Sequence, residues 1–350
     1  MDIKKLLALM VSRSASDLIL SAGSPPTLRV DGKLSPLQIP PLAADECGET
    51  IIQCLSEDQK GELEQQQDVN FSYSAPGLGR FRANVHRQRG TLAAAIRLVS
   101  ARSPNLGDLG LPDIVAELAD RPKGLLLVTG PTGSGKSTTL AAIVQKINTT
   151  RYCHVITVED PIEHMFTNDK SIIEQREVGK DTPSFASALT HVLRQDPDVV
   201  MIGEMLDKQT IGEALTAAET GHVVLSTLHT NDCSQTIDRI VDVFDGGTQP
   251  QIRLQLSMVL AGIVSQQLVE RRGGGRALVC EVLVNTPAVS NLIRKGETAQ
   301  IKNAIMTGSS AGMISMEKSL AKLQAGGMIE TGADDLYSAS SLDDAQTATL

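Results

Sequence analysis

The chain has 350 residues, of which 41% are hydrophobic and 21% are charged. This length accommodates two domains, and this composition is typical of a globular protein with an apolar core, which excludes extensive disorder. The formal net charge of -9 argues against a surface adapted as a whole to nucleic acid, because phosphate binding needs a concentrated basic face. The five cysteines are scattered without a Cys-x-x-Cys pair, which indicates reduced thiols rather than a zinc or redox site.

Residues 1–100 predict a small α+β domain. The apolar run at residues 6–11 is shorter than a membrane span and lacks a cleavage site, so we expect an amphipathic first helix in a cytoplasmic protein. Helices are expected to begin at Asp45 and at Ser56, and Asp31-Gly32 is a favoured hairpin turn. Short apolar runs between turn residues predict strands at residues 16–20, 27–30, 79–85 and 91–99.

Residues 101–112 are rich in Ser, Pro, Gly and Asp, which predicts a linker between two domains. Strand and helix patterns then alternate over residues 113–330, which predicts an α/β core with a parallel sheet covered by helices on both faces. The later part of this core is expected to be helical, and residues 331–350 are expected to fray. The predicted core strands are residues 124–129, 154–158, 198–202 and 222–227, and the predicted helices are residues 135–148, 207–220 and 235–244.

The strongest functional signal is a phosphate-binding loop between a predicted strand and a predicted helix. Glycines let backbone amides approach phosphate oxygens, Lys136 reaches the terminal phosphates, and the Ser137 hydroxyl can ligate Mg²⁺. The start of the following helix adds the positive end of its dipole. The sequence therefore predicts an ATPase of the P-loop class that binds ATP and Mg²⁺. The loop residues are Gly130, Pro131, Thr132, Gly133, Ser134, Gly135, Lys136 and Ser137, with Thr138 next in the helix.

Carboxylates follow two of the other predicted core strands. Glu204 comes after residues 198–202 and is a candidate for polarising the attacking water or for holding Mg²⁺ through water. Glu159, Asp160 and Glu163 come after residues 154–158. Because ligands of open parallel sheets lie beyond the carboxyl ends of the strands, we expect these acids near the phosphate loop. A solvated acidic loop is the alternative interpretation.

Histidines and arginines supply further candidates. His229 follows the strand at residues 222–227 and is a candidate phosphate sensor, whereas for His222 a phosphate-sensing role and a structural role both stay open. The predicted strand pair at residues 79–99 carries several arginines, which form either a solvated basic face or the charge that a neighbouring subunit or domain supplies to the γ-phosphate. These arginines are Arg80, Arg82, Arg87, Arg89 and Arg97.

Together these motifs resemble the secretion and pilus ATPase superfamily, and most closely its PilT-like pilus-retraction branch. The phosphate loop is followed, in the order typical of this family, by an acidic box at residues 157–163, a strand-and-Glu box at residues 194–205 and a histidine box at residues 220–230. Residues 286–294 resemble the C-terminal signature of the retraction branch, with Val289 and Ser290 departing from it, and Leu206 stands where the family has Arg. The lack of a long N-terminal extension and of a tetracysteine zinc site also favours the retraction type.

The resemblance implies a homo-hexameric ring in which each chain has a PAS-like N-terminal domain and a RecA-like core. It implies ATP hydrolysis that drives pilin back into the membrane through an inner-membrane platform protein, from the cytoplasmic face. Within that ring, Arg80, Arg82 and Arg97 become the expected trans-acting charges for the nucleotide, beside the candidate catalytic residues Glu204, Glu159, Glu163 and His229.

Three other functions fit parts of the sequence. The first is an extension or type II secretion motor of the same superfamily. The second is a DNA translocase, although the acidic balance and the scarcity of aromatic residues for base stacking weigh against it. The third is a non-hydrolysing regulatory paralogue, which Leu206 keeps open.

Overall fold

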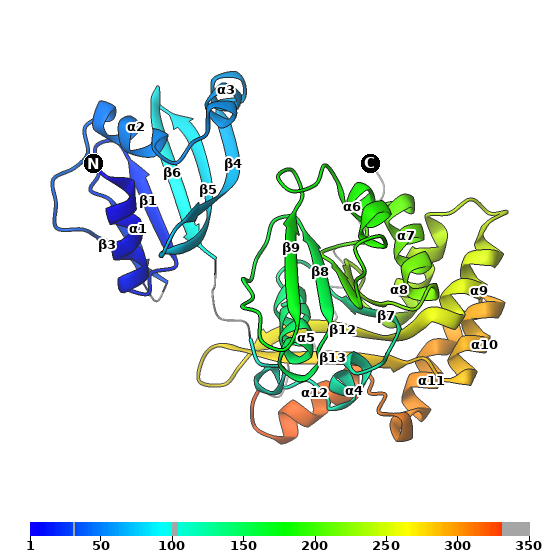
Figure 1. Cartoon of the computed structure of the whole chain (residues 1–350). Coiled ribbons are helices and arrows are strands. Elements are labelled where there is room, and N and C mark those ends of the chain that lie inside the picture. The colour runs from blue at the N-terminus through cyan, green and yellow to red at the C-terminus, as the bar shows by residue number, and fades with distance from the viewer. Residues whose placement is uncertain (31, 100–103, 331–350) are drawn as a thin grey trace. The chain divides into compact units, whose positions relative to one another are not determined.

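The computed structural model describes residues 1–30, 32–99 and 104–330. It comprises two compact units, one formed by Met1–Arg102 with Glu163–Met165 and the other by Ser103–Ile162 with Phe166–Leu350. Figure 1 shows the chain coloured from its N-terminus to its C-terminus. The predicted tail, Asp31 of the predicted hairpin turn and residues 101–103 of the predicted linker lie outside the described residues.

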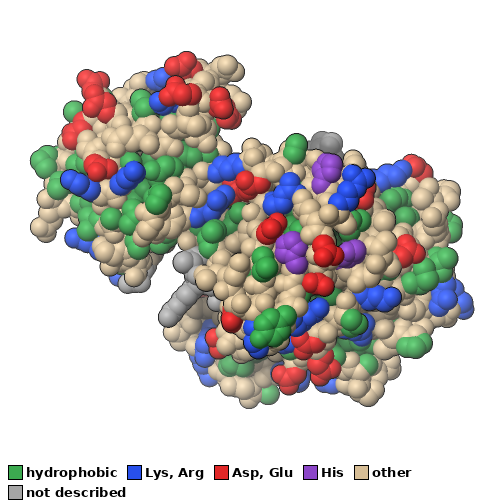
Figure 2. Space-filling view, in the orientation of Figure 1, with side chains coloured by type: hydrophobic (Ala, Val, Ile, Leu, Met, Phe, Trp, Pro, Cys, Tyr) green, Lys and Arg blue, Asp and Glu red, His purple; other side chains and the backbone are tan. Residues whose placement is uncertain are grey.

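The N-terminal unit is built around a six-stranded antiparallel sheet in the order β3-β2-β1-β6-β5-β4. Side chains alternate along β5, so that Phe81, Ala83 and Val85 are buried while Arg82 on the opposite face is exposed. On the visible face of this unit, basic and acidic side chains are interspersed among apolar ones (Figure 2). The elements are α1 (Ile3–Ser12), β1 (Asp17–Ser21), β2 (Thr27–Val30), β3 (Lys33–Pro36), α2 (Ala44–Ile52), α3 (Glu57–Gln66), β4 (Asp68–Ala75), β5 (Gly79–Gln88) and β6 (Thr91–Leu98).

The two predicted helix starts of this unit have different outcomes. Ser56 is the N-cap of α3 and forms a capping box in which its side chain and that of Gln59 each bond the other residue's backbone amide. The prediction that Asp45 caps α2 is wrong, because the N-cap is Ala43, which makes no side-chain bond, and Asp45 lies within the first turn. An acid inside the first turn still interacts favourably with the helix dipole.

The second unit contains a seven-stranded sheet in the order β13-β12-β7-β11-β10-β8-β9. All neighbouring strands are parallel except β12 and β13. The elements are η1 (Leu106–Leu109), α4 (Ile114–Ala119), β7 (Gly124–Thr129), α5 (Lys136–Thr150), β8 (His154–Glu159), β9 (Ile172–Glu177), α6 (Phe185–Val192), β10 (Val199–Ile202), α7 (Lys208–Glu219), β11 (Val223–Leu228), α8 (Cys233–Asp242), α9 (Gln249–Val259), β12 (Leu260–Glu270), β13 (Arg276–Val284), α10 (Pro287–Lys295), η2 (Thr298–Gln300), α11 (Ile301–Thr307), η3 (Ser309–Ala311) and α12 (Met316–Ala325).

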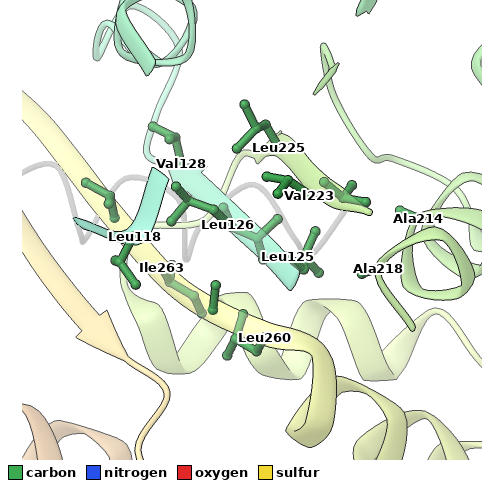
Figure 3. Close-up of a cluster of buried hydrophobic side chains, with 14 of the residues drawn as sticks. Leu118, Leu125, Leu126, Val128, Ala214, Ala218, Val223, Leu225, Leu260 and Ile263 are labelled. Carbon is green, nitrogen blue, oxygen red and sulfur yellow. The ribbon is translucent and has the colours of Figure 1, made fainter. Parts of the chain in front are cut away.

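The core of this unit lies on both faces of the sheet. Every residue of β7, β10 and β11 is buried, as expected for parallel strands covered on two sides. Figure 3 shows Leu125 and Leu126 of β7 between Val223 of β11 and Ile263 of β12. The predicted alternation of strands and helices over residues 124–228 is confirmed, and the parallel direction of β7, β8, β10 and β11 places the loops that follow them at one edge of the sheet.

The expectation that the later part of the core is helical is wrong in one region. Residues 260–284 form the long antiparallel hairpin β12–β13, which extends the sheet beyond β7. Helix α9 ends at Val259 and β12 begins at the next residue, so no turn residue separates them. Because the first seven residues of β12 are buried on both faces, the strand shows no alternation that would distinguish it from a buried helix.

None of the helices within residues 1–30, 32–99 and 104–330 has the length and apolar character needed to cross a bilayer.

Candidate active site

The phosphate loop joins the end of β7 to the start of α5, and its shape requires glycine. Gly130 has a φ of +143°, and a Cβ at this position would lie 2.2 Å from the backbone oxygen of Gln266. Gly133 and Gly135 also have positive φ, at +79° and +88°. Gly135 is the N-cap of α5 and makes no side-chain capping bond. The first amides of this helix are therefore left for an anionic ligand, which fits a nucleotide phosphate.

Lys136 is held over the loop that precedes it. Its Nζ donates hydrogen bonds to the backbone oxygens of Gly130 at 2.8 Å and Pro131 at 3.0 Å. The residue is 8% exposed, so its ammonium group has a fixed position. Ser137 follows it and is exposed, so its hydroxyl is accessible to a metal ion bound with the nucleotide.

His229 and Glu204 extend this cluster across two further strand ends. His229 Nδ1 lies 3.4 Å from Lys136 Nζ, and its Nε2 lies 3.3 Å from Glu204 Oε2. The side chains of Glu204 and His229 are 33% and 43% exposed, so both groups are open to solvent and substrate. The structure thus brings Lys136, His229 and Glu204 into one row at the carboxyl edge of the sheet. Histidine and acidic side chains also lie near one another on the visible face of this unit (Figure 2).

Side chains of β11 fix the turn that carries Glu204. Ser226 Oγ donates to the backbone oxygen of Ile202 at 2.9 Å, and Thr227 Oγ1 donates to that of Gly203 at 2.6 Å. Neither hydroxyl group was predicted from the sequence, because a Ser-Thr pair inside an apolar strand is not part of a catalytic motif. Their only signal was their position next to a strand end that carries a carboxylate.

The acids that follow β8 have different environments. Glu159 is 7% exposed and accepts hydrogen bonds from Thr157 Oγ1 at 2.7 Å and Gln175 Nε2 at 3.0 Å. It lies beside the Glu204 turn, since the Gly203 amide bonds the backbone oxygen of Val158. Gln175 was missed because β9 itself was not predicted. Glu163 belongs with the N-terminal unit and remains a prediction.

His222 does not join this row of residues. It precedes β11, at the opposite end of the strand from His229, and its Nδ1 lies 2.9 Å from the backbone oxygen of Ala217. Since a carbonyl oxygen only accepts, His222 Nδ1 donates this bond, which helps to close the C-terminus of α7. Gly221, next to it, has a φ of +112°, as predicted for the residue that ends this helix.

The arginines of the N-terminal unit share one face of its sheet. Arg82 and Arg97 are direct cross-strand partners on β5 and β6, and Arg80 lies two residues before Arg82, on the same face. Arg97 Nε donates to Asp17 at 2.8 Å. Arg82 also has a carboxylate partner, Glu163, with Nη1 3.8 Å from Oε1, so the role of these arginines remains a prediction.

No group of three or more His, Cys, Asp or Glu side chains arranged to hold a metal ion is found in the described parts of the chain.

A family model described as Type II/IV secretion system protein matches residues 90–328. The chain belongs to this family. Among members of the Type II/IV secretion system family, the type IV pilus retractation ATPase PilT of Pseudomonas aeruginosa is 44% identical to it, over 94% of this chain and 96% of the relative. The twitching motility protein of Neisseria gonorrhoeae is also 44% identical, over 87% and 82%.

A solved structure of the pilus retraction motor PilT with bound ADP has 46% sequence identity and a TM-score of 0.87, with 94% of this chain and 95% of that chain covered. The ATPase DotB of Legionella pneumophila has 27% identity and a TM-score of 0.84, with 97% and 96% covered. The predicted likeness to the PilT-like branch of the Type II/IV secretion system family is confirmed. The predicted fold class, a RecA-like core preceded by a small α+β domain, is confirmed with it, and the assignment of the phosphate loop as the nucleotide site remains a prediction.

Proposed function

We propose that this chain is an ATP-hydrolysing motor that powers retraction of type IV pili. The observation that carries the proposal is the row formed by Lys136, His229 and Glu204 beside a glycine-shaped phosphate loop. The chain is 44% identical to a retraction ATPase over nearly its whole length, which supports retraction over the extension and secretion motors. The curated type II secretion proteins with 43% to 46% identity match only 44% to 51% of this chain.

Each residue of the row has a separate role in the proposed reaction. Backbone amides of the phosphate loop and of the start of α5, together with the Lys136 ammonium, bind the triphosphate and offset the charge that develops on it. Glu204 accepts a proton from, or orients, the attacking water, and His229 links this carboxylate to Lys136 and so responds to the terminal phosphate. Glu159, held by Thr157 and Gln175, contributes negative charge beside the same turn, and Glu163 is a further candidate catalytic residue.

The site also fits Mg²⁺. Ser137 is the hydroxyl residue that follows the loop lysine, and Glu204 lies at the neighbouring strand end, where it can hold the ion through water. When bound, the ion neutralises charge on the β- and γ-phosphates. Removal of Mg²⁺ with a chelator should therefore abolish turnover.

In this proposal the chain acts as a homo-hexamer at the cytoplasmic face of the inner membrane. Each ring site takes Arg80, Arg82 and Arg97 from a neighbouring N-terminal unit, and movement of the units pulls on an inner-membrane platform protein and through it on pilin. No direct contact with nucleic acid is expected. The proposed boundaries are residues 1–100 for the N-terminal domain, 101–112 for the linker and 113–330 for the core.

A gene deletion scored for both pilus number and twitching tests the biological role. Loss of a retraction motor should leave abundant pili that do not move, and the wild-type gene should restore movement while the Glu204→Gln gene should not. Loss of the pili themselves would instead support an extension or secretion motor.

ATPase measurements on purified protein test the chemistry. The Glu204→Gln variant should lose at least about a hundredfold in turnover, since general-base and water-positioning groups contribute about 10²–10⁴, but should still bind ADP. Glu219→Gln, a surface change on α7, is the matched control and should keep wild-type turnover. Wild-type protein without ATPase activity would indicate a regulatory paralogue, and stimulation by DNA would indicate a translocase.

A further inference from the structure

The side-chain amide of Gln266 bridges the phosphate loop and helix α5. Its Nε2 donates a hydrogen bond to the backbone oxygen of Ser134 at 2.7 Å, and its Oε1 accepts one from Thr139 Oγ1 at 2.9 Å. Gln266 is completely buried, and Ser134 and Thr139 are 3% and 2% exposed. Because a carbonyl oxygen only accepts hydrogen bonds, the Ser134 contact fixes which end of the amide faces the loop.

The two contacts of Gln266 enclose the part of the backbone that must face the phosphates. Ser134 immediately precedes Gly135, the N-cap of α5, and Thr139 lies in the first turns of that helix. The amides of residues 135–138 lie between these two anchors. At the other end of the loop, the backbone oxygen of Gln266 packs so closely on Gly130 that a Cβ there would be 2.2 Å away. Residue 266 therefore contacts the loop near both of its ends.

The partner strand adds a third contact. Arg276 of β13 places its Nη1 3.4 Å from the backbone oxygen of Gly133, and it is paired in register with Glu270 of β12. The hairpin β12–β13 thus reaches two successive loop carbonyls, those of Gly133 and Ser134. Both contacts tie the backbone of the loop to this hairpin.

We propose that Gln266 is a positioning residue that holds the phosphate loop in its phosphate-binding shape, a role that rests on the proposed function. An apolar residue would fill this buried position without a polar group that needs partners, whereas the Gln266 amide bonds Ser134 of the loop and Thr139 of α5. Gln267, the next residue on β12, points to the opposite face of the strand.

Replacement of Gln266 by leucine should weaken ADP binding while the protein stays folded. We expect the Gln266→Leu variant to bind a fluorescent ADP analogue about tenfold more weakly than wild type, equivalent to about 1.4 kcal/mol. Thr139→Val, which removes the second partner only, should cause a smaller loss. Gln267→Glu is the matched control on the same strand and should bind like wild type. Affinity is measured without turnover, with thermal unfolding of the nucleotide-free protein alongside.

A Gln266→Glu variant separates positioning from simple packing. An ionised Glu can still accept from Thr139 but cannot donate to Ser134, whereas a protonated Glu can do both. Burial raises the pKa of a carboxyl group, so the affinity of this variant, expressed relative to wild type at each pH, should recover as the pH falls from 8 to 5.5. A residue that only filled space would give a ratio independent of pH.

Each outcome decides the inference. The positioning role would be overturned if Gln266→Leu bound ADP as tightly as wild type, or if the affinity of Gln266→Glu relative to wild type did not change with pH. If Gln266→Leu does not fold, the pH series of Gln266→Glu and the affinity of Thr139→Val decide. Wild-type protein that binds no ADP at all would instead refute the proposed function, because an ATP-hydrolysing motor must bind the nucleotide.

Discussion

Gly130 shows how closely one residue of the phosphate loop is constrained. Both its backbone conformation and its surroundings exclude a side chain, since an added Cβ would meet the backbone oxygen of Gln266 at 2.2 Å and Ser134 Oγ at 2.7 Å. A backbone oxygen within a paired strand cannot move aside as a flexible side chain can. The glycine is thus required by the hairpin behind the loop as well as by the phosphate in front of it.

A Gly130→Ala substitution should therefore destabilise the protein more than an alanine at an open position with positive φ. The matched control is Gly179→Ala, where φ is +82° and nothing lies within 4 Å of the added Cβ. Both variants incur roughly 1–2 kcal/mol for the backbone conformation, and Gly130→Ala should lose about 1–3 kcal/mol more through overpacking. If both variants lost the same free energy of unfolding in urea, the phosphate loop and β12 would be shown to separate easily.

Glu281 is a buried carboxyl group outside the row of catalytic candidates. It is 6% exposed and accepts a hydrogen bond from the Cys233 amide at the start of α8, at 3.0 Å. Desolvation by burial raises its pKa, and the charges of Asp232 and Glu317 add to this, although the bonds from Cys233 oppose it. In the folded protein Glu281 therefore keeps its proton to a higher pH than in the unfolded chain.

The raised pKa gives a predicted direction for stability against pH. The stabilising contribution of protonated Glu281 is complete below its unfolded pKa and is lost as the pH rises through its folded pKa. Glu281→Gln keeps an oxygen for the Cys233 amide but cannot ionise, so urea unfolding should show the variant gaining stability relative to wild type between pH 4 and pH 8. Glu62→Gln, an exposed change in α3, controls for the loss of one carboxylate. If the stability of Glu281→Gln relative to wild type stayed constant or fell as the pH rose, the raised pKa of Glu281 would be contradicted.

At the scale of elements, α2 lacks the side-chain N-cap that α3 has. Ser56 caps α3 through its side chain, whereas Ala43 occupies the N-cap of α2 with an extended backbone, at φ -64° and ψ 159°, and no side-chain bond. That conformation is the one in which a serine hydroxyl bonds a first-turn amide. Ala43 is exposed, so a slightly larger side chain meets no packing constraint.

An Ala43→Ser substitution should accordingly stabilise the N-terminal unit by about 0.5–1 kcal/mol. Ser56→Ala should cost about 1 kcal/mol in the same unit, because it removes the equivalent bond from α3. Both changes should appear in hydrogen exchange of the amides near each helix start. If Ala43→Ser gives no gain while Ser56→Ala gives a loss, the start of α2 already has its amides satisfied by other groups.

The sequence predicted those elements whose ends carry turn or capping residues. Strand β7 and helix α5 were placed from the phosphate loop between them, and α7 from Asp207 and Gly221. Strand β9 was missed because its sequence, IIEQRE, is polar and forms an edge of the sheet. The hairpin β12–β13 was missed because continuous burial removes the alternation by which a strand is recognised.

The candidate site was predictable only where residue type and motif coincide. Lys136, Glu204 and His229 stand directly after strands of one parallel sheet, so their convergence follows from the topology. Gln266 and Thr227 lie within strands that contact the loop or the Glu204 turn from behind. Their importance depends on which strands are neighbours in space, and the order β12-β7-β11-β10 was not available from local patterns.

At the scale of the whole molecule, the chain consists of two units, and each carries charged side chains with a proposed role at the nucleotide. The core carries the phosphate loop and Glu204, and the N-terminal unit carries a face on which Arg82 and Arg97 lie directly opposite each other. In a closed ring of identical subunits, each interface joins different surfaces of two neighbours. An arginine of one subunit can therefore complete the site of the next, as the proposed function requires.

Mixed rings of two inactive variants distinguish an arginine supplied in trans from one supplied in cis. An Arg82→Ala subunit keeps Glu204, and a Glu204→Gln subunit keeps Arg82, so a trans arrangement creates complete sites where the two meet in the right order. Coexpressed at equal levels and purified through two tags, such rings should regain roughly a quarter of wild-type turnover, since one interface in about four has the productive order in a heterologous ring.

The matched control for the mixed rings combines Lys136→Ala with Glu204→Gln. Lys136 and Glu204 lie in the same row of one subunit, joined through His229, so no interface of such rings contains a complete site and turnover should stay at the level of the separate variants. Recovery in the first mixture alone supports the trans arrangement. If both mixtures remain inactive although the tags prove coassembly, Arg82 acts on the nucleotide of its own subunit, and the trans arrangement is wrong.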